Sequence, residues 1–152
     1  MEYAGIKTFE ELACWKKCRD LRVFVAKTVI PNLPRDEKYR LGDQLIRSAR
    51  SATANIAEGF GRFHYLDNAK FCSNSRGSCL EVLDHLIAAQ DEGLLPEKLV
   101  REGRALVVHA VRILNGYIHY LQKAGAARPP RIPITNNGEP ITDNRHPMAP
   151  PE

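Results

Sequence analysis

Apolar residues recur at helical spacing along most of this chain, and this periodicity limits the possible folds more than any other feature. The first run steps by three and four residues through Cys14, Cys18, Leu21, Val25 and Thr28. Such spacing places all its members on one face of an α-helix. Three further runs of this kind follow, and we find no segment with the alternating pattern of a strand. The sequence therefore predicts an all-α domain.

The first helix should begin near Phe9 and end near Ile30. Thr8 is followed three residues later by Glu11, the spacing of a capping box, in which each side chain bonds the other's backbone. Pro31 follows the apolar run, and proline lacks the N–H that a continuing helix requires. We therefore expect this helix to stop before Pro31.

The second and third helices have their own boundary signals. The second should run from about Glu37 to Glu58, with Gly59 as its C-cap. The third should follow Asp67 as N-cap and continue to Gly93. Gly77 falls inside the third helix, where glycine costs about 1 kcal/mol relative to alanine. We therefore expect another backbone to approach closely at Gly77.

The fourth helix should begin at Pro96, a residue favoured in a first helical turn, and its apolar stripe continues to Leu121. Short connections join the successive helices, which favours antiparallel neighbours. The expected architecture is an up-down-up-down four-helix bundle over residues 1–124. Residues 125–152 hold seven of the chain's ten prolines and should form a mostly disordered, Pro-rich tail. A short stretch of it could dock on the bundle through Ile132 and Ile134.

The cysteines and histidines give no clear metal or catalytic pattern. The cysteines form two pairs, Cys14 with Cys18 and Cys72 with Cys79. Both pairs lie inside apolar-periodic segments rather than in the tight turns typical of zinc sites. We therefore expect reduced thiols in the core or at an interface, with a metal or redox role as the alternative. The sequence contains no H-E-x-x-H motif and no P-loop. We therefore predict no catalytic residues, no metal and no cofactor. No apolar stretch approaches the length of a membrane span, so we expect a cytoplasmic protein without membrane contact.

Arginines along the second helix suggest a surface for a polyanion. Arg40, Arg47 and Arg50 follow one another at steps of seven and three, and Arg62 and Lys70 continue the row. Guanidinium groups match phosphate oxygens, so these five residues are our candidate nucleic-acid-binding residues. The alternative is an ordinary solvated face, neutralised by carboxylates nearby. The formal net charge of +4 permits a polyanionic partner without requiring one.

Three blocks of the sequence carry a family resemblance. They are Trp15, the stretch YRLGDQLIRSARSATANIAEGFGR at 39–62, and SRGSCLEVLDHL at 75–86. Together, over roughly residues 8–122, they resemble the four-helix-bundle proteins encoded within intervening sequences of bacterial 23S rRNA genes. The resemblance implies a small cytosolic bundle that forms a ring-like homopentamer, without known catalysis.

A second group is similar in fold: the accessory variability determinants of diversity-generating retroelements, basic pentamers thought to bind nucleic acid and a reverse transcriptase. The intact NIAEG block matches the first group better. The first hypothesis is therefore a non-enzymatic homo-oligomer, expected to be a pentamer, that binds RNA or DNA. The competing hypothesis is a scaffold that recruits a protein such as a reverse transcriptase, and the third is a small hydrolase or metalloprotein.

The small-residue stretch before Arg62 suggests close helix packing. We expect the end of the second helix to lock against the third where Gly77 gives room, with Glu58 as a buried carboxylate that accepts bonds from around Ser75 to Ser78. Arg62 or Arg76 would neutralise it. The alternative is an ordinary solvent-exposed helix end. This motif consists of Asn55, Glu58, Gly59, Gly61, Arg76, Gly77 and Ser78.

Overall fold

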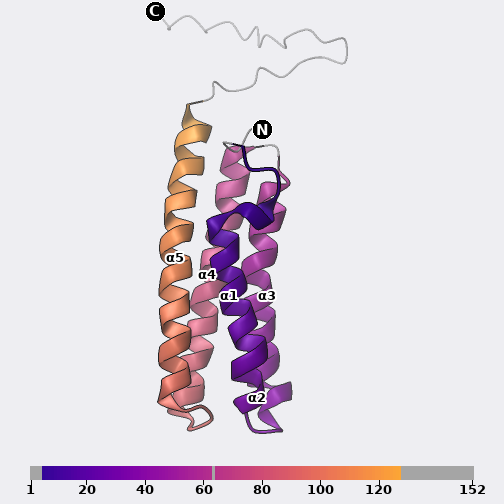
Figure 1. Ribbon diagram of the computed structural model, residues 1–152, viewed down its shortest axis with the longest axis vertical. Coiled ribbons are helices and arrows are strands. Elements are labelled where there is room, and N and C mark those ends of the chain that lie inside the picture. Colours follow the sequence, from indigo (N-terminus) through magenta and orange to yellow (C-terminus); the bar gives the residue numbers. More distant parts are fainter. Residues whose placement is uncertain (1–4, 63, 128–152) are drawn as a thin grey trace, which may run out of the picture.

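Four long helical rods packed side by side make up the computed structural model, which describes residues 5–62 and 64–127 (Figure 1). The first rod is continuous through three elements, α1, a π-helical turn and α2. The rods are α1 Ala13–Phe24 with the π-helical turn Val25–Val29 and α2 Ile30–Asn32, then α3 Leu41–Phe60, α4 Tyr65–Asp91 and α5 Glu97–Ala126. Short 3₁₀ turns at Phe9–Glu11 and Glu37–Tyr39 precede α1 and α3. The predicted all-α four-helix bundle is confirmed.

Successive rods run in opposite directions, so the bundle has the predicted up-down-up-down order (Figure 1). The first rod packs against α3 on one side and α5 on the other, and α4 packs against the same two helices. One end of the bundle therefore gathers the start of α1, the connection between α3 and α4, and the end of α5. We call this the upper end, as it appears in Figure 1.

Each rod contributes one apolar stripe to a single core. Leu21, Leu45, Leu86 and Leu114 are fully buried, one from each rod. Burial of a leucine side chain stabilises the folded state by about 1.5–3 kcal/mol. The stripes therefore account for the association of the helices, as the periodicity predicts.

The first rod differs from its predicted course at both ends. Its α-helix begins at Ala13 rather than Phe9. The capping box does not form, because the Glu11 carboxylate accepts a hydrogen bond from the Lys7 backbone N–H instead, at 3.3 Å. The π-helical turn adds a residue to the helical period. The core position after Val25 is therefore the buried Val29, and the expected Thr28 is only half-buried.

Pro31 does not stop the first rod, which continues to Asn32. Pro31 is the second residue of α2, which directly follows the π-helical turn, so its ring fits the helical φ but gives no N–H to the preceding turn. The Asn32 side-chain amide donates to the Thr28 carbonyl at 2.7 Å. Thus a side chain completes the hydrogen bonding around the proline.

The ends of the other helices also move from their predicted positions. Gly59 lies inside α3 and Gly61 is the C-cap. The N-cap of α4 is His64, and Asp67 lies within the first turn. Gly93, with φ +69°, lies just past the end of α4 as expected.

The last rod, α5, continues to Ala126, two residues past the predicted boundary. Gly125 lies against Leu66 of α4, and a Cβ atom at Gly125 would lie 2.7 Å from Leu66 Cδ2. This close approach extends the packed helix beyond the point where the composition changes. The predicted disorder and docking of the tail concern residues 128–152, which lie outside the described residues.

Candidate nucleic-acid interface

Three of the five candidate cations lie along one exposed side of α3. Arg40 precedes the helix, and Arg47 and Arg50 follow within it; all three are exposed. Arg47 pairs with Asp43, whose carboxylate lies 2.8 Å from Nε, and Arg40 lies 3.7 Å from Glu37. Exposed ion pairs of this kind are worth about 0–1 kcal/mol, so a phosphate could displace the carboxylates. Among the described residues, Arg50 has no acidic partner.

The first rod adds cations to the same surface, and none of them is among the five predicted from the sequence. Arg22 reaches across from α1 and donates to the Thr53 hydroxyl of α3 at 2.8 Å. Thr53 in turn donates to the backbone carbonyl of Arg50 at 3.1 Å. The guanidinium of Arg22 also lies 5.9 Å from the Trp15 ring centre. Arg22 is therefore held within one helical turn of Arg50, between the two helices.

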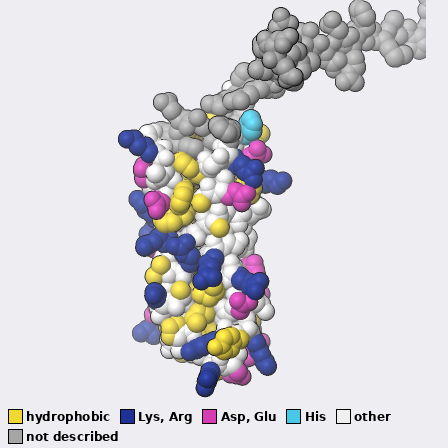
Figure 2. Space-filling model, turned by 90° about the vertical axis from the view of Figure 1, so that its right-hand side faces the viewer, with side chains coloured by type: hydrophobic (Ala, Val, Ile, Leu, Met, Phe, Trp, Pro, Cys, Tyr) yellow, Lys and Arg dark blue, Asp and Glu magenta, His cyan; other side chains and the backbone are white. Residues whose placement is uncertain are grey.

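The first rod is also strongly basic. From 13 to 32 it carries five cationic side chains and a single carboxylate, Asp20; the cations are Lys16, Lys17, Arg19, Arg22 and Lys27. Asp20 pairs with Lys17 at 3.3 Å. The side of the molecule seen in Figure 2 shows cationic side chains gathered at mid-height, with apolar side chains between them. We name Arg19, Arg22, Arg47 and Arg50 the α1–α3 basic face.

Arg62 and Lys70 lie apart from this face. Arg62, near the upper end, pairs with Glu58 at 2.8 Å and stacks over the Phe71 ring at 4.8 Å. Lys70 lies on α4 beside a groove that α5 borders with Asn115 and His119. The structure therefore divides the five predicted residues among separate surfaces.

Glu58 does not form the expected buried tie between α3 and α4. Its side chain is 54% exposed, and its partner Arg62 follows four residues later, just past the end of α3. Asn55 also bonds within α3, and donates to the Ser51 carbonyl at 2.9 Å and to the Ser51 hydroxyl at 3.0 Å. Arg76 donates instead to Asn115 of α5 at 2.8 Å. The charged members of the motif therefore bond elsewhere.

The tie between α3 and α4 exists, but serines make it. Ser75 donates to the backbone carbonyl of Ala52 at 2.6 Å, and the hydroxyls of Ser51 and Ser78 lie 2.9 Å apart. Ser75 is fully buried, so its hydroxyl needs the partner that Ala52 supplies. We call this contact, with the glycine described next, the α3–α4 seam.

The glycine of the seam is Gly59, and the expectation for Gly77 is wrong. A Cβ atom at Gly59 would lie 2.6 Å from Asn68 Oδ1 and 2.8 Å from Phe71 Cβ, both on α4. A Cβ atom at Gly77 would meet nothing within 4 Å. Gly61 is the C-cap of α3, and a Cβ atom there would make an ordinary contact with the Glu58 carbonyl. The small residue that permits close approach is thus the one predicted to be a cap.

The four cysteines are buried free thiols, as predicted. The Sγ atoms of Cys18 and Cys79 lie 3.6 Å apart, so α1 and α4 meet across the core. Burial raises the pKa of Cys72 to about 12 and raises that of Cys14 still further. Because the thiolate is the reactive form, these two side chains stay protonated and unreactive at neutral pH.

Within residues 5–62 and 64–127, no three His, Cys, Asp or Glu side chains are grouped so as to hold a metal ion. Glu81 and His85, the nearest approach to a carboxylate–histidine motif, lie 3.5 Å apart on one turn of α4. Within the same ranges, no helix is long and apolar enough to cross a bilayer.

These features define a class: a four-helix-bundle protein whose rods are tied by small residues and serines, with a basic surface on α1 and α3. The model of one protein family, the 23S rRNA-intervening sequence protein, matches residues 10–116. The chain belongs to this family. A search of curated proteins finds no match.

Sequence reasoning missed Arg22 and the two serine contacts, and it did not place Trp15 at this surface. Trp15 and Arg22 lie seven residues apart, a spacing that places them on the same helical flank. That signal was available in the sequence, but it gives no indication that the flank faces Arg50. The partners of Ser51 and Ser75 depend on the register between α3 and α4, which no local pattern encodes.

Proposed function

We infer that this protein is a non-enzymatic, homo-oligomeric bundle that binds RNA through its α1–α3 basic face. The observation that carries the proposal is the placement of Arg22 beside Arg50, held by Thr53 at 2.8 Å. Because the Arg22 guanidinium is already held, it loses little conformational entropy when it binds phosphate. The family's name mentions 23S rRNA, so we choose RNA as the polyanion to test first.

Charge distribution supports this face over the rest of the surface. The first rod has a large cationic excess, whereas α4 carries Lys70 and Arg76 against four carboxylates, Asp67, Glu81, Asp84 and Asp91. A polyanion is therefore attracted to the α1 side of the bundle and repelled by much of α4. Lys70 and Arg62 become secondary contacts in this proposal.

Salt-dependent RNA binding tests the proposal. We would measure the affinity of the full chain for a fluorescent single-stranded RNA at several salt concentrations. Each phosphate contact contributes about 0.7 to the slope of log K against log salt. Arg19→Ala and Arg50→Ala should each lower the slope by about 0.7, the contribution of one phosphate contact. A DNA of the same length should bind more weakly.

Arg101→Ala is the matched control. Arg101 is an exposed arginine of α5 that lies 3.7 Å from Glu97, so its removal changes the net charge equally without touching the proposed face. Equal loss of slope in the control would contradict the assignment of the face. A chain that binds no RNA at any salt concentration would contradict the proposal and favour the scaffold alternative.

Self-association is the second part of the proposal. Apolar side chains are exposed on α1, α4 and α5, with Val23 40%, Leu80 49% and Val108 59% exposed. Contact between copies would bury them. Light scattering at micromolar concentration should give a mass near five times the protomer's 17.1 kDa, and a stable monomer would overturn this part.

A further inference from the structure

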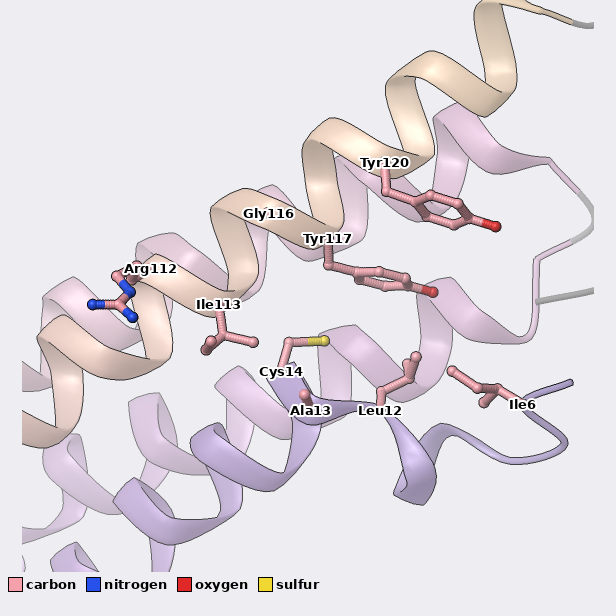
Figure 3. A pocket seen from close by; sticks show the side chains of 9 residues that line it. All are labelled: Ile6, Leu12, Ala13, Cys14, Arg112, Ile113, Gly116, Tyr117 and Tyr120. Atoms are coloured by element: carbon pink, nitrogen blue, oxygen red, sulfur yellow. The ribbon is translucent and has the colours of Figure 1, made fainter. Parts of the chain in front are cut away.

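An apolar groove lies between the start of the first rod and the upper half of α5 (Figure 3). Its volume is about 440 Å³. Tyr117 and Tyr120 project from α5 over the opening, and Leu12, Cys14 and Ile6 form the opposite side. The first rod and α5 therefore leave apolar surface uncovered at the upper end of the bundle.

The aromatic wall of the groove is fixed in place. The Tyr117 and Tyr120 rings are stacked, with centres 6.2 Å apart and planes inclined by 15°. The Tyr117 hydroxyl accepts a hydrogen bond from the Asn68 side chain of α4 at 3.2 Å. Tyr120 is 42% exposed. A ligand would thus meet a preformed aromatic surface and would not have to order it.

We propose that the chain's own Pro-rich segment, residues 129–134, occupies this groove, with Ile132 and Ile134 against Tyr117 and Tyr120. Proline-rich segments bind aromatic-lined grooves because their extended conformation is already restricted before binding. The segment reads Pro-Pro-Arg-Ile-Pro-Ile. It therefore offers prolines for the rings and two isoleucines for the apolar floor.

The length of the connection fits this occupant. The described chain leaves α5 at Ala127, at the same end as the groove. Tyr120 and Tyr117 lie about 10 and 15 Å back along the helix, at 1.5 Å per residue. The seven residues from Ala127 to Ile134 span up to about 23 Å when extended. The segment can thus turn back and reach both tyrosines.

The groove's size also favours an extended segment over a helix of a second copy. One helical turn is about 5.4 Å long and 10 Å wide, so a single turn would fill the whole volume of about 440 Å³. Two isoleucine side chains and a proline ring are smaller than this volume. The proposal does not depend on RNA binding, because the groove and the α1–α3 basic face share no residue.

Methyl NMR of the full chain tests this inference. With isoleucine methyls labelled, Ile132 and Ile134 should show upfield ring-current shifts and nuclear Overhauser contacts to the Tyr117 and Tyr120 rings. The matched control is Ile141, a third isoleucine of the same segment, which should show neither. Ile132→Asp combined with Ile134→Asp should shift the groove methyl of Ile113, whereas Ile141→Asp should leave it unchanged.

Two results would overturn the inference. Ile132 and Ile134 resonances that match those of Ile141 would show that the segment does not dock. Contacts that appear only between differently labelled chains in a mixed sample would assign the groove to a segment of a second copy. Both results come from the natural chain, so no substitution that could affect folding is involved.

Discussion

The α3–α4 seam and the groove between the first rod and α5 show two ways in which helices of one bundle meet. Along the seam, α4 lies so close to Gly59 that a Cβ atom there would clash with Asn68 and Phe71. Ser75 donates a hydrogen bond to the Ala52 carbonyl, which fixes the register of the two helices. Along the groove, Tyr117 and Tyr120 extend into a space of about 440 Å³. Small residues close one contact, and large aromatic residues leave the other open.

This difference separates what maintains the bundle from what remains for binding. The seam uses one buried and one partly buried serine hydrogen bond and leaves no room for a side chain at Gly59. The open side presents a fixed aromatic surface, and the adjacent α1–α3 contact presents Arg22, whose guanidinium donates to Thr53. We therefore expect substitutions at the seam to change stability, and substitutions outside it to change binding.

The largest effect should come from filling the seam. Gly59→Ala places a Cβ atom 2.6 Å from Asn68 Oδ1 and 2.8 Å from Phe71 Cβ, so we expect a loss of about 1–3 kcal/mol in the free energy of unfolding. Urea denaturation followed by circular dichroism measures it.

Gly116→Ala is the matched substitution in the groove. A Cβ atom at Gly116 would meet nothing within 4 Å, and alanine is favoured over glycine in a helix by about 1 kcal/mol. This variant should therefore be slightly more stable than the natural chain. Destabilisation by both substitutions to the same extent would remove the distinction between seam and groove.

The buried thiols should make stability decrease at alkaline pH. The ordinary thiol pKa is 9.0, and burial raises that of Cys72 to about 12. Above pH 9 the unfolded thiol ionises while the folded one remains protonated, so unfolding becomes easier as pH rises, until the folded thiol also ionises near pH 12. One thiol contributes a slope of up to about 1.4 kcal/mol per pH unit.

Cys72→Ala removes this contribution and should give a shallower decrease between pH 9 and pH 11 than the natural chain. Denaturation at three pH values gives the two slopes. Since lysines and tyrosines also titrate in this range, only the difference between the slopes is informative. Parallel slopes would show that Cys72 is not shielded from ionisation in the folded state.

A smaller effect should follow from the loss of the serine tie. Ser75→Ala removes the 2.6 Å bond to the Ala52 carbonyl, and we expect a cost of about 1 kcal/mol. Ser73→Ala is the control, because half-buried Ser73 only accepts a long 3.4 Å contact from Arg76. Thermal unfolding of both variants compares them, and equal melting temperatures would contradict a role for Ser75 in the seam.

The sequence predicted the features that depend on local period and failed on those that depend on register. Leu45 and Leu86 reached the core because a helical stripe is a local pattern. Gly59 and Gly77 could not be distinguished in this way, since their neighbours come from another helix. The same reason explains why Glu58, expected to be buried, is exposed and paired with Arg62.

The candidate interface shows the same division. The spacing of Arg47 and Arg50 correctly predicted one exposed side of α3. The contribution of Arg22 depends on how α1 lies against α3, and Lys70 proved to be on a different surface for the same reason. In the first rod, the π-helical turn shifted the stripe from Thr28 to Val29, a change that no propensity scale anticipates.

Amide hydrogen exchange measures most directly whether the bundle is divided into a closed seam and an open pair of helices. The account predicts that amides of residues 48–59 and 68–79 exchange only through global unfolding, whereas those of residues 13–17 and 112–121 exchange about tenfold faster or more through local opening. Uniform protection across all four rods, or slower exchange beside the groove than along the seam, would contradict it.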